Sequence, residues 1–380
     1  MLSPAPATDV PSGAPLEAVV HIALRIGRLL LVNGADTSHT QRQVTEAITS
    51  FGYKGDFFIS AEALLLSIKN GEKILTKVGP RISGMAADMG RLVELEQVLD
   101  RLRHGTRDIS ALDAELDTVE FRPSGHSLLL VILGIALTAA SLARLFGAEW
   151  PVVGAAFVAG AFSILLRLNF ARRKWNPIGA AFLTAFLSGL AGALLLHRFP
   201  HFSPALCLVA AGMILVPGVP LINGVRDVVA GHAGNGIARL SLGSATVLAI
   251  GFALFLAAFM TGAPIEVGVA PQSGLDITSA TLLGATVAGL FARLCARACR
   301  VPPVIFAFPG VVAMVPGSYA FRAGIGGVEL MRQGASASFQ LGAETLSLVI
   351  TAVLITVAIA IGLTLALSIP PEKSAFPHPS

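Results

Sequence analysis

Eight long apolar runs follow one another after residue 126, and they constrain the fold more than any other feature of the chain. Each has about the length that an α-helix needs to cross a bilayer, roughly 20 residues. Composition agrees, because 54% of the 380 residues are hydrophobic and only 13% are charged, whereas soluble domains carry about 25% charged residues. The sequence therefore predicts a polytopic α-helical membrane protein with about eight spans: 127–145, 151–168, 177–196, 203–222, 240–261, 275–295, 303–321 and 343–368.

Residues 16–121 hold most of the charge and predict a small α+β domain that lies in the cytoplasm. The run from Leu16 to Gly34 is apolar, but polar side chains recur in it at helical spacing, which predicts an amphipathic helix rather than a span: Glu17, His21, Arg25 and Arg28. Further helices are expected at 37–51, around 85–102 and at 109–120, with two strands flanking Asn70-Gly71. Residues 1–15 and 371–380 are predicted to be tails.

Basic residues predict the orientation of the spans, because Lys and Arg concentrate on the cytoplasmic side. One set of connections carries Arg172, Arg173, Lys174, Arg226, Arg239, Arg293, Arg297 and Arg300. The opposite set is expected to carry Arg144, Arg198, Arg322 and Arg332. This asymmetry predicts that both termini are cytoplasmic and that the protein lies in the cytoplasmic (inner) membrane. Residues 122–262 form a first membrane segment of five spans, and residues 263–370 a second one of three.

Two of the runs contain the sequence Val-Pro-Gly at the same depth. Pro217 and Pro316 each stand fourteenth, counted from Pro204 and Pro303 respectively. Proline and glycine both interrupt a helix, and the two runs cross in opposite directions in the predicted topology. Paired interrupted helices of opposite polarity are typical of inverted-repeat transporters, whose substrate site lies at the breaks. The alternative is that both breaks are ordinary kinks, which are common in membrane helices.

The chain resembles the threonine/serine exporter family (ThrE type). The resemblance rests on three stretches: "NGADTSHTQRQVTEAITSFGY" (33–53), "LVPGVPLINGVRDVVAGHAGNGIARL" (215–240) and "VPPVIFAFPGVVAMVPGSYAFRAG" (301–324). It implies a soluble N-terminal domain joined to a membrane domain, with a second membrane segment that is either fused or encoded as a separate chain. It also implies that threonine and serine are the substrates, which composition alone does not indicate.

The chain departs from the family pattern in two places. His39, Thr40 and Gln41 stand where family members often show Arg-x-Glu after the threonine, so an ionic role for that loop does not carry over. The fused members resemble proteins of about ten spans, which implies that the second membrane segment is short here. Oligomerisation could compensate for the missing spans, and the sequence leaves a homo-oligomer open.

The breaks supply the candidate substrate-binding residues: Pro217, Gly218, Asn223, Pro316, Gly317, Ser318 and Tyr319. A helix N-terminus at Gly218 or Gly317 suits a carboxylate, freed carbonyls or an acid suit an ammonium, and Asn223, Ser318 or Tyr319 suits a hydroxyl. Candidates for coupling or gating are Arg226, Asp227, Arg322 and Glu344. The competing interpretations are a polar surface loop for Arg226 and Asp227, a dipole-favoured interfacial acid for Glu344, and a simple helix N-cap for Asp36, Thr37 and Ser38.

These features predict a secondary exporter of threonine and serine. The sequence contains no GxxxxGK[ST] phosphate-binding loop, so the expected driving force is an ion gradient, most simply protons in antiport. Two alternatives remain, namely export of small carboxylates such as succinate and a membrane-anchored sensor or enzyme. The soluble domain shows no catalytic constellation, and we expect no catalytic residue, metal, cofactor or nucleic-acid partner. The expected partners are a small amino acid, protons and the lipid bilayer.

Overall fold

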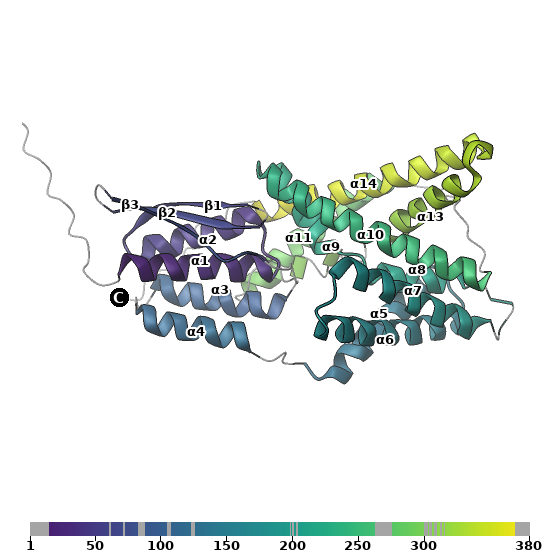
Figure 1. The fold of residues 1–380 in the computed structure, drawn as a ribbon, viewed down its shortest axis with the longest axis horizontal. Coiled ribbons are helices and arrows are strands. Elements are labelled where there is room, and N and C mark those ends of the chain that lie inside the picture. The colour runs from purple at the N-terminus through teal and green to yellow at the C-terminus, as the bar shows by residue number, and fades with distance from the viewer. Residues whose placement is uncertain are drawn as a thin grey trace, which may run out of the picture. The chain divides into compact units, whose positions relative to one another are not determined.

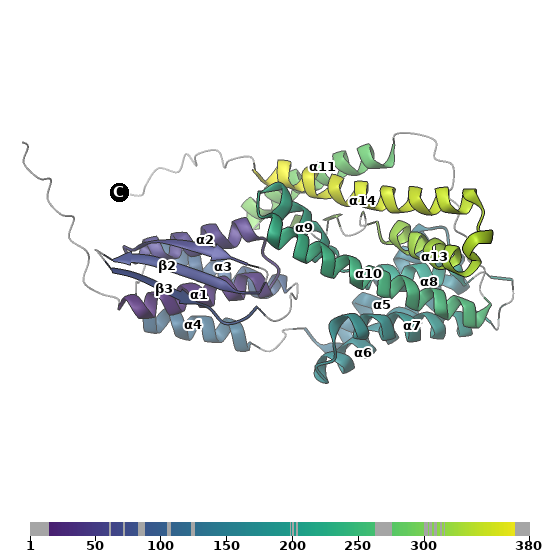
Figure 2. The same ribbon diagram turned by 45° about the horizontal axis from the view of Figure 1, so that its top comes forward.

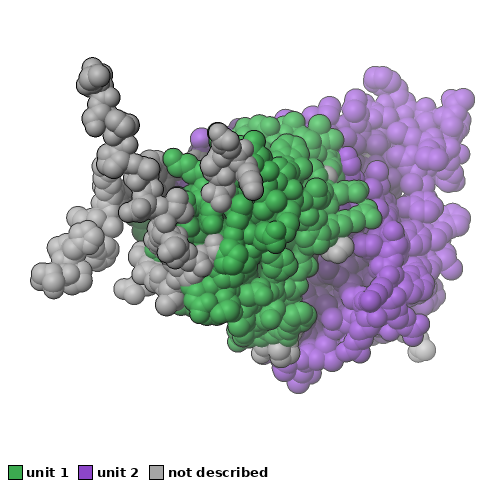
Figure 3. Space-filling view, turned by 60° about the vertical axis from the view of Figure 1, so that its left-hand side comes forward, with its two compact units in different colours: residues 1–123, 223–239, 296–305 green, residues 124–222, 240–295, 306–380 purple. Residues whose placement is uncertain are grey.

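The computed structural model describes most of the chain: residues 15–60, 62–70, 73–82, 88–104, 108–122, 126–197, 199, 201–202, 204–262, 276–299, 303, 306–307, 310–311, 314 and 316–368. It divides into two compact units, coloured separately in Figure 3. The first contains residues 1–123, 223–239 and 296–305, and the second contains the remainder. The predicted tails and most of the connection at 262–274 lie outside the described residues.

The first unit is built in three layers, which Figures 1 and 2 show from two sides. An antiparallel sheet of order β1-β2-β3 lies on one helical pair, α1 with α2, and a second pair, α3 with α4, covers the other side of the first. The elements are α1 (Leu16–Val32), α2 (Thr37–Ser50), β1 (Lys54–Ile59), β2 (Leu64–Asn70), β3 (Lys73–Val78), α3 (Met89–His104) and α4 (Ile109–Phe121). These elements confirm the predicted small α+β region.

Helix α1 is apolar around most of its circumference because it lies between the sheet and the outer helices. Its buried residues include Ile22, Ile26 and Leu30. The predicted polar stripe does not lie free in water as on a simple amphipathic helix. Arg25 donates to Asp113 Oδ1 at 2.6 Å and to Glu120 Oε2 at 2.9 Å on α4. The position of α1 in the middle layer therefore explains why its composition resembles that of a membrane span.

The sheet has three strands where the sequence predicted two. The pair β2–β3 is the predicted hairpin, with Asn70 opposite Lys73. The additional strand is β1, which pairs with β2 from Lys54 opposite Lys69 to Ile59 opposite Leu64. Its inner face buries Phe57 and Ile59 in the core of the unit. Lys54, Asp56 and Phe58 alternate with these positions and are exposed, so the pattern is that of a half-buried strand.

The second unit is a bundle of long apolar helices packed through small residues. Its elements are α5 (Leu128–Leu145), α6 (Trp150–Arg172), α7 (Pro177–Leu196), α8 (Ala205–Met213), α9 (Gly218–Val229), α10 (Ala233–Thr261), α11 (Ile277–Cys299), α13 (Gly317–Gln333), a 3-10 turn (Gly334–Ser336) and α14 (Phe339–Ser368). Helices α9 and α10 also supply residues 223–239 to the first unit. A Cβ atom added at Gly160 would lie 2.7 Å from Ala139 Cβ, so α5 and α6 approach closely through glycine and alanine.

Six described helices are long and apolar enough to cross a membrane: Leu128–Leu145, Trp150–Arg172, Pro177–Leu196, Ala233–Thr261, Ile277–Cys299 and Phe339–Leu367. They confirm a multi-pass helical membrane protein. The two predicted spans that are missing from this set are those with Val-Pro-Gly. The fourth, 203–222, is divided into α8 and α9. Much of the seventh, 303–321, lies outside the described residues, and its described helix begins only at Gly317.

Helix bounds correct six sequence-based placements. Asn223, Arg226 and Asp227 were expected in a polar loop, but they lie within α9. Arg239 lies within α10, and Arg322 and Arg332 lie within α13 rather than in a connection. Helix α13 continues beyond the predicted end because its polar residues find local partners: Arg332 Nε donates to Glu329 Oε2 at 2.8 Å, at i,i+3 spacing.

Candidate functional site

The first Val-Pro-Gly sequence interrupts the helix over four residues. Helix α8 ends at Met213 and α9 begins at Gly218. Between them the backbone turns tightly: Leu215 N donates to Gly212 O at 3.0 Å, Val216 N to Met213 O at 3.3 Å and Gly218 N to Val216 O at 2.8 Å. Pro217 has no amide hydrogen to donate and cannot continue the ladder. The interruption predicted from the sequence is therefore present in the structure.

The turn leaves backbone acceptors at the break. Among the described residues, no backbone amide donates to the carbonyl oxygen of Ile214 or of Leu215. Both residues lie within the second unit, next to α8. A carbonyl removed from water requires a donor, and irregular backbone at membrane depth is tolerated where it lines a cavity or is buried in protein. The break therefore offers two acceptors of the kind that holds an ammonium or hydroxyl.

Gly317, the last residue of the second Val-Pro-Gly sequence, lies against the segment that contains the first. Helix α13 begins at Gly317, directly after Pro316. A Cβ atom added at Gly317 would lie 3.2 Å from Met213 Cγ and 3.2 Å from Val216 Cγ2. Such a separation is closer than ordinary van der Waals contact, so glycine permits the N-terminus of α13 to approach the end of α8. Gly317 thus lies beside Val216, which directly precedes Pro217 and Gly218, and Ser318 and Tyr319 follow in the first turn of α13.

Arg322 and Glu344 lie farther from this meeting point. Arg322 is half-buried in the second turn of α13. Glu344 is the sixth residue of α14, which begins at Phe339, rather than part of the opening turn, and it accepts from Gln340 Nε2 at 2.8 Å. The neighbouring Thr345 packs on Gly326, nine residues beyond Gly317, which corresponds to about 13 Å along the helix axis. The structure does not bring Glu344 to the break.

A second polar cluster lies in the first unit, where the loop 33–37 meets the end of α9 and the start of α10. Asp227, 1% exposed, accepts from Thr37 N at 3.0 Å and from Thr37 Oγ1 at 2.9 Å. Arg239 Nε lies 3.4 Å from Asp227 Oδ2. Arg226 Nη1 lies 3.1 Å from Asp36 Oδ2. Two carboxylates and two guanidinium groups therefore balance in charge inside the unit.

Backbone carbonyls of the loop complete this cluster. Asn223 Nδ2 donates to Gly34 O at 2.9 Å, and Arg239 Nη2 donates to Ala35 O at 3.2 Å. Asn235 Nδ2 donates to Ile59 O at 3.0 Å at the end of β1. One atom remains unsatisfied, because Asn223 Oδ1 is buried without a donor among the described residues. Buried acceptors of this kind are few in native proteins, which makes Asn223 a position of interest.

The two carboxyl groups of the cluster have opposite pKa shifts. Burial alone would raise the pKa of Asp36, but Arg226, His39 and Arg239 together hold it below its usual value. Burial raises the pKa of Asp227, and Arg239 and the Thr37 hydrogen bonds oppose the rise only in part. Asp36 is therefore the more firmly ionised partner, whereas Asp227 is the acid whose charge depends on its contacts with Thr37 and Arg239.

Sequence reasoning found part of this cluster and missed the rest. The expected N-cap is confirmed, since Asp36 Oδ1 accepts from His39 N at 2.9 Å. Thr37 was considered only with Asp36 and Ser38 as part of a helix N-cap, and Asn235 and Arg239 were not singled out as site residues. A signal was available, because polar side chains gather in the two stretches that carry the family resemblance. Their pairing across 190 residues could not be read from either stretch alone.

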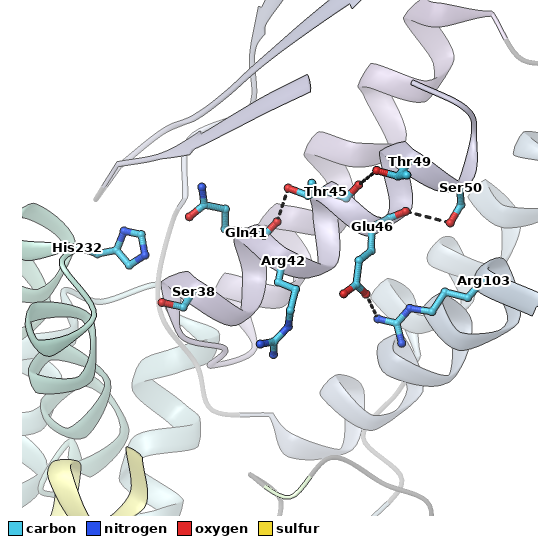
Figure 4. A pocket seen from close by; sticks show the side chains of 9 residues that line it. All are labelled: Ser38, Gln41, Arg42, Thr45, Glu46, Thr49, Ser50, Arg103 and His232. Carbon is cyan, nitrogen blue, oxygen red and sulfur yellow. Dashed lines mark hydrogen bonds and ion pairs between the residues drawn. The ribbon is translucent and has the colours of Figure 1, made fainter. Parts of the chain in front are cut away.

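A polar groove of about 880 Å³ runs beside α2 in the first unit, and Figure 4 shows its lining. The lining residues are Ser38, Gln41, Arg42, Thr45, Glu46, Thr49, Ser50, Arg103 and His232. Most of its polar groups are already engaged: Thr45 and Thr49 hydroxyls donate one turn back along α2, and Arg103 pairs with Glu46. We therefore place the candidate substrate site at the break.

No group of three or more His, Cys, Asp or Glu side chains among the described residues could hold a metal ion. The interrupted helix and the N-terminal α+β region instead fit a transporter family. A family model described as "Putative threonine/serine exporter" matches residues 21–261, and a second, described as "Threonine/Serine exporter, ThrE", matches residues 267–369. The chain belongs to the threonine/serine exporter family. Both family segments are present in this one chain.

Curated relatives carry two kinds of name. The chain is 22% identical over 381 residues to "Threonine/serine exporter" of Corynebacterium glutamicum, a match that covers 84% of this chain and 78% of the relative. It is 27% identical over 249 residues to "Probable succinate transporter subunit YjjP" of Klebsiella aerogenes, covering 64% of this chain and 95% of that relative. The protein of the same name from Escherichia coli is 27% identical over 236 residues, covering 61% and 90%. No solved structure matches the chain.

Proposed function

We propose that this protein is a secondary exporter that carries threonine and serine out across the cytoplasmic membrane, with both termini in the cytoplasm. The observation that carries the proposal is the approach of the N-terminus of α13 to the first break, where Gly317 packs against Met213 and Val216. Helix N-termini and freed carbonyls converge at that point from two parts of the membrane unit. Such breaks are the place where secondary transporters of known architecture bind their substrates.

Each group of a hydroxylated amino acid has a counterpart at the break. The first-turn amides of α13, which begins at Gly317, have no partner within their own helix and suit the carboxylate, whereas the amide of Gly218 already donates to Val216 O at 2.8 Å. The carbonyl oxygens of Ile214 and Leu215 suit the ammonium. Ser318 and Tyr319, in the first turn of α13, suit the hydroxyl. Asn223, five residues after Gly218 on the same helix, offers a buried acceptor to a substrate that passes along α9.

Export of a small dicarboxylate is the second candidate, and the names of the Klebsiella and Escherichia relatives favour it. The hydrogen-bond acceptors at the break and on Asn223 favour amino acids as substrates instead. Ile214 O, Leu215 O and Asn223 Oδ1 are all acceptors, and each requires a donor. Threonine and serine bring an ammonium and a hydroxyl, whereas succinate at neutral pH is a dianion without donors. We therefore favour amino acids as substrates.

We propose that protons drive export by antiport, because the sequence contains no phosphate-binding loop for ATP. Glu344 is the acid to test first, since an ionisable side chain in a long apolar span such as α14 is a functional candidate. The carboxylate of Asp227 already accepts a hydrogen bond from Thr37 and pairs with Arg239. Its charge therefore stabilises contacts within the first unit. Arg226 and Arg322 are proposed gating residues.

The proposal is tested with purified full-length protein in proteoliposomes. Labelled threonine, serine and succinate are offered separately, with and without an imposed proton gradient. We expect saturable transport of threonine and serine that the gradient accelerates, and little transport of succinate. Transport of succinate alone would overturn the amino-acid assignment and establish the second candidate. Transport of none of the three by correctly inserted protein would overturn the exporter proposal.

A further inference from the structure

We infer that the loop 33–37 of the soluble domain is a positioning element for α9, and that it sets the place of the helical break through Thr37, Asp227 and Arg239. This inference rests on the proposed transport function for its consequence. Its structural part stands on the first unit alone, which contains all of the contacts. It assigns a task to the soluble domain, which otherwise has no evident part in transport.

The contact is specific because its polar groups are buried and mutually matched. Asp227 is 1% exposed and Arg239 is 3% exposed. The carboxylate of Asp227 accepts hydrogen bonds from the amide and the hydroxyl of Thr37, and it also forms an ion pair with Arg239. A buried charge that loses its partner retains the full cost of its desolvation. The loop and α9 therefore fit together in one register, and a slip by one turn would leave charges unpaired.

The contact with the loop extends over a full turn of α9. Asn223 Nδ2 donates to the carbonyl oxygen of Gly34, and Arg226 pairs with Asp36. Asn223, Arg226 and Asp227 stand at i, i+3 and i+4, so they present one face of α9 to the loop. Two side chains from the start of α10 also donate to backbone carbonyls: Asn235 to Ile59 O, and Arg239 to Ala35 O. The end of α9 is thus clamped between the loop and α10.

Helix α9 connects these contacts to the break without an interruption. It runs unbroken from Gly218 to Val229, and Asp227 lies nine residues after Gly218, about 13 Å along the axis. A hydrogen-bonded helix of this length moves as one piece, so displacement of Asp227 displaces Gly218. The contacts that the loop makes with Asp227 therefore act on the same helix that begins at the break.

One feature distinguishes the cluster from an ordinary buried core. A static polar core satisfies every buried group, but Asn223 Oδ1 has no donor among the described residues. The network is complete around Asp227 and incomplete around Asn223, one turn nearer the break. Such partial satisfaction suits a contact that yields or gains a partner during the transport cycle.

The test uses three variants of the full-length protein in proteoliposomes. Thr37→Val removes the hydroxyl donor at nearly constant volume, and Thr37→Ser keeps it. Thr45→Val is the matched control, because Thr45 lies on the same helix but is exposed and donates only to Gln41 O. We expect Thr37→Val to lower the maximal transport rate per folded molecule about tenfold, with substrate affinity changed less than twofold. Thr37→Ser and Thr45→Val should retain the wild-type rate.

A second measurement needs no transport substrate. Val219 is replaced by Cys in a background without Cys207, Cys295 and Cys299, and its maleimide labelling rate is compared between the Thr37 variants. We expect Thr37→Val to change the labelling rate at least threefold relative to Thr37→Ser. An unchanged labelling rate would overturn the inference, whatever the substrate proves to be. Changed labelling in a protein that transports none of the three substrates would sustain the positioning role while the proposed function fails.

Discussion

Thr37 donates both its backbone amide and its hydroxyl to the carboxylate of Asp227, a residue 190 positions later in the chain. The pair joins the start of α2 in the soluble domain to α9, the helix that begins at the first Val-Pro-Gly break. Because Arg239 contacts the same carboxylate, removal of either charged side chain leaves the other buried without its partner. Thr37 is the residue through which we propose that the N-terminal α+β unit positions α9.

A side chain at Gly317 should abolish transport. Gly317→Leu would drive its side chain into Met213 and Val216, each of which has an atom only 3.2 Å from the place that a Cβ atom would occupy, and would separate the two breaks. Gly218→Leu should act similarly by filling the start of α9. Gly327→Leu, on the same helix α13 but facing open space, is the control and should transport normally. Surface abundance and transport rate are measured together; normal export by both Gly218 and Gly317 variants would mean that the breaks are only kinks.

Loss of the Asp227 carboxylate should destabilise the protein. Asp227→Ala leaves Arg239 buried without its partner, and breaking a buried ion pair in this way costs about 3–5 kcal/mol. Asp276→Ala, at an exposed helix start, should change stability by less than about 0.5 kcal/mol. Thermal unfolding of detergent-solubilised protein measures the difference. Equal midpoints for the two variants would show that the Asp227–Arg239 pair is not energetically important.

Glu344 should couple protons to export. Glu344→Gln keeps the shape of the side chain but cannot release a proton, so gradient-driven export should fall to the level seen without a gradient. Threonine exchange should persist, because exchange requires binding and alternation but no net proton transfer. Glu329→Gln, an acid that pairs with Arg332 on α13, is the control. Wild-type gradient-driven export by Glu344→Gln would remove Glu344 from the proton route.

The orientation of the chain can be read by chemical labelling. A cysteine at position 270, in the connection between the two membrane segments, should react with an impermeant maleimide in intact cells. A cysteine at Lys174, which lies two residues after the end of α6, should react only after the cells are opened. Both sites are tested in the cysteine-free background. The reverse pattern would place both termini outside the cytoplasm.

Acid should loosen α4 from α1. Burial alone would raise the pKa of Glu120, but Arg28 and Arg25 hold it below its ordinary value of 4.5. A carboxyl with a lowered folded-state pKa contributes stability that is present in full above about pH 4.5 and is lost as the pH falls through the folded-state pKa. Hydrogen exchange of α4 should therefore accelerate below pH 4.5 in the wild type. Glu120→Gln should already exchange faster at pH 7 and respond less to acid; Glu62→Gln, in an exposed pair with Arg81, should behave as the wild type.

Local sequence was sufficient for most elements and for the first break. Helices in the soluble domain were expected within a few residues of their observed bounds, because apolar periodicity and caps such as Asp36 act over one or two turns. Pro217 and Gly218 interrupt a helix whatever surrounds them, so the division between α8 and α9 followed from composition. Strand β1 was missed because its alternation is short, and its pairing partner β2 determines whether it forms.

Tertiary structure alone decided which of the recognised polar residues act together. Asn223, Arg226 and Asp227 resemble a surface loop in sequence, since nothing nearby reveals that Gly34, Asp36 and Thr37 bury them. Glu344 had the sequence pattern of a site residue, yet its helix places it away from the break. Hydrophobic periodicity and helix breaks are encoded over a few turns, whereas hydrogen bonds and ion pairs depend on residues far apart in the chain. The sequence by itself therefore determined the membrane class and the first break, and only the packed structure determined which polar groups meet.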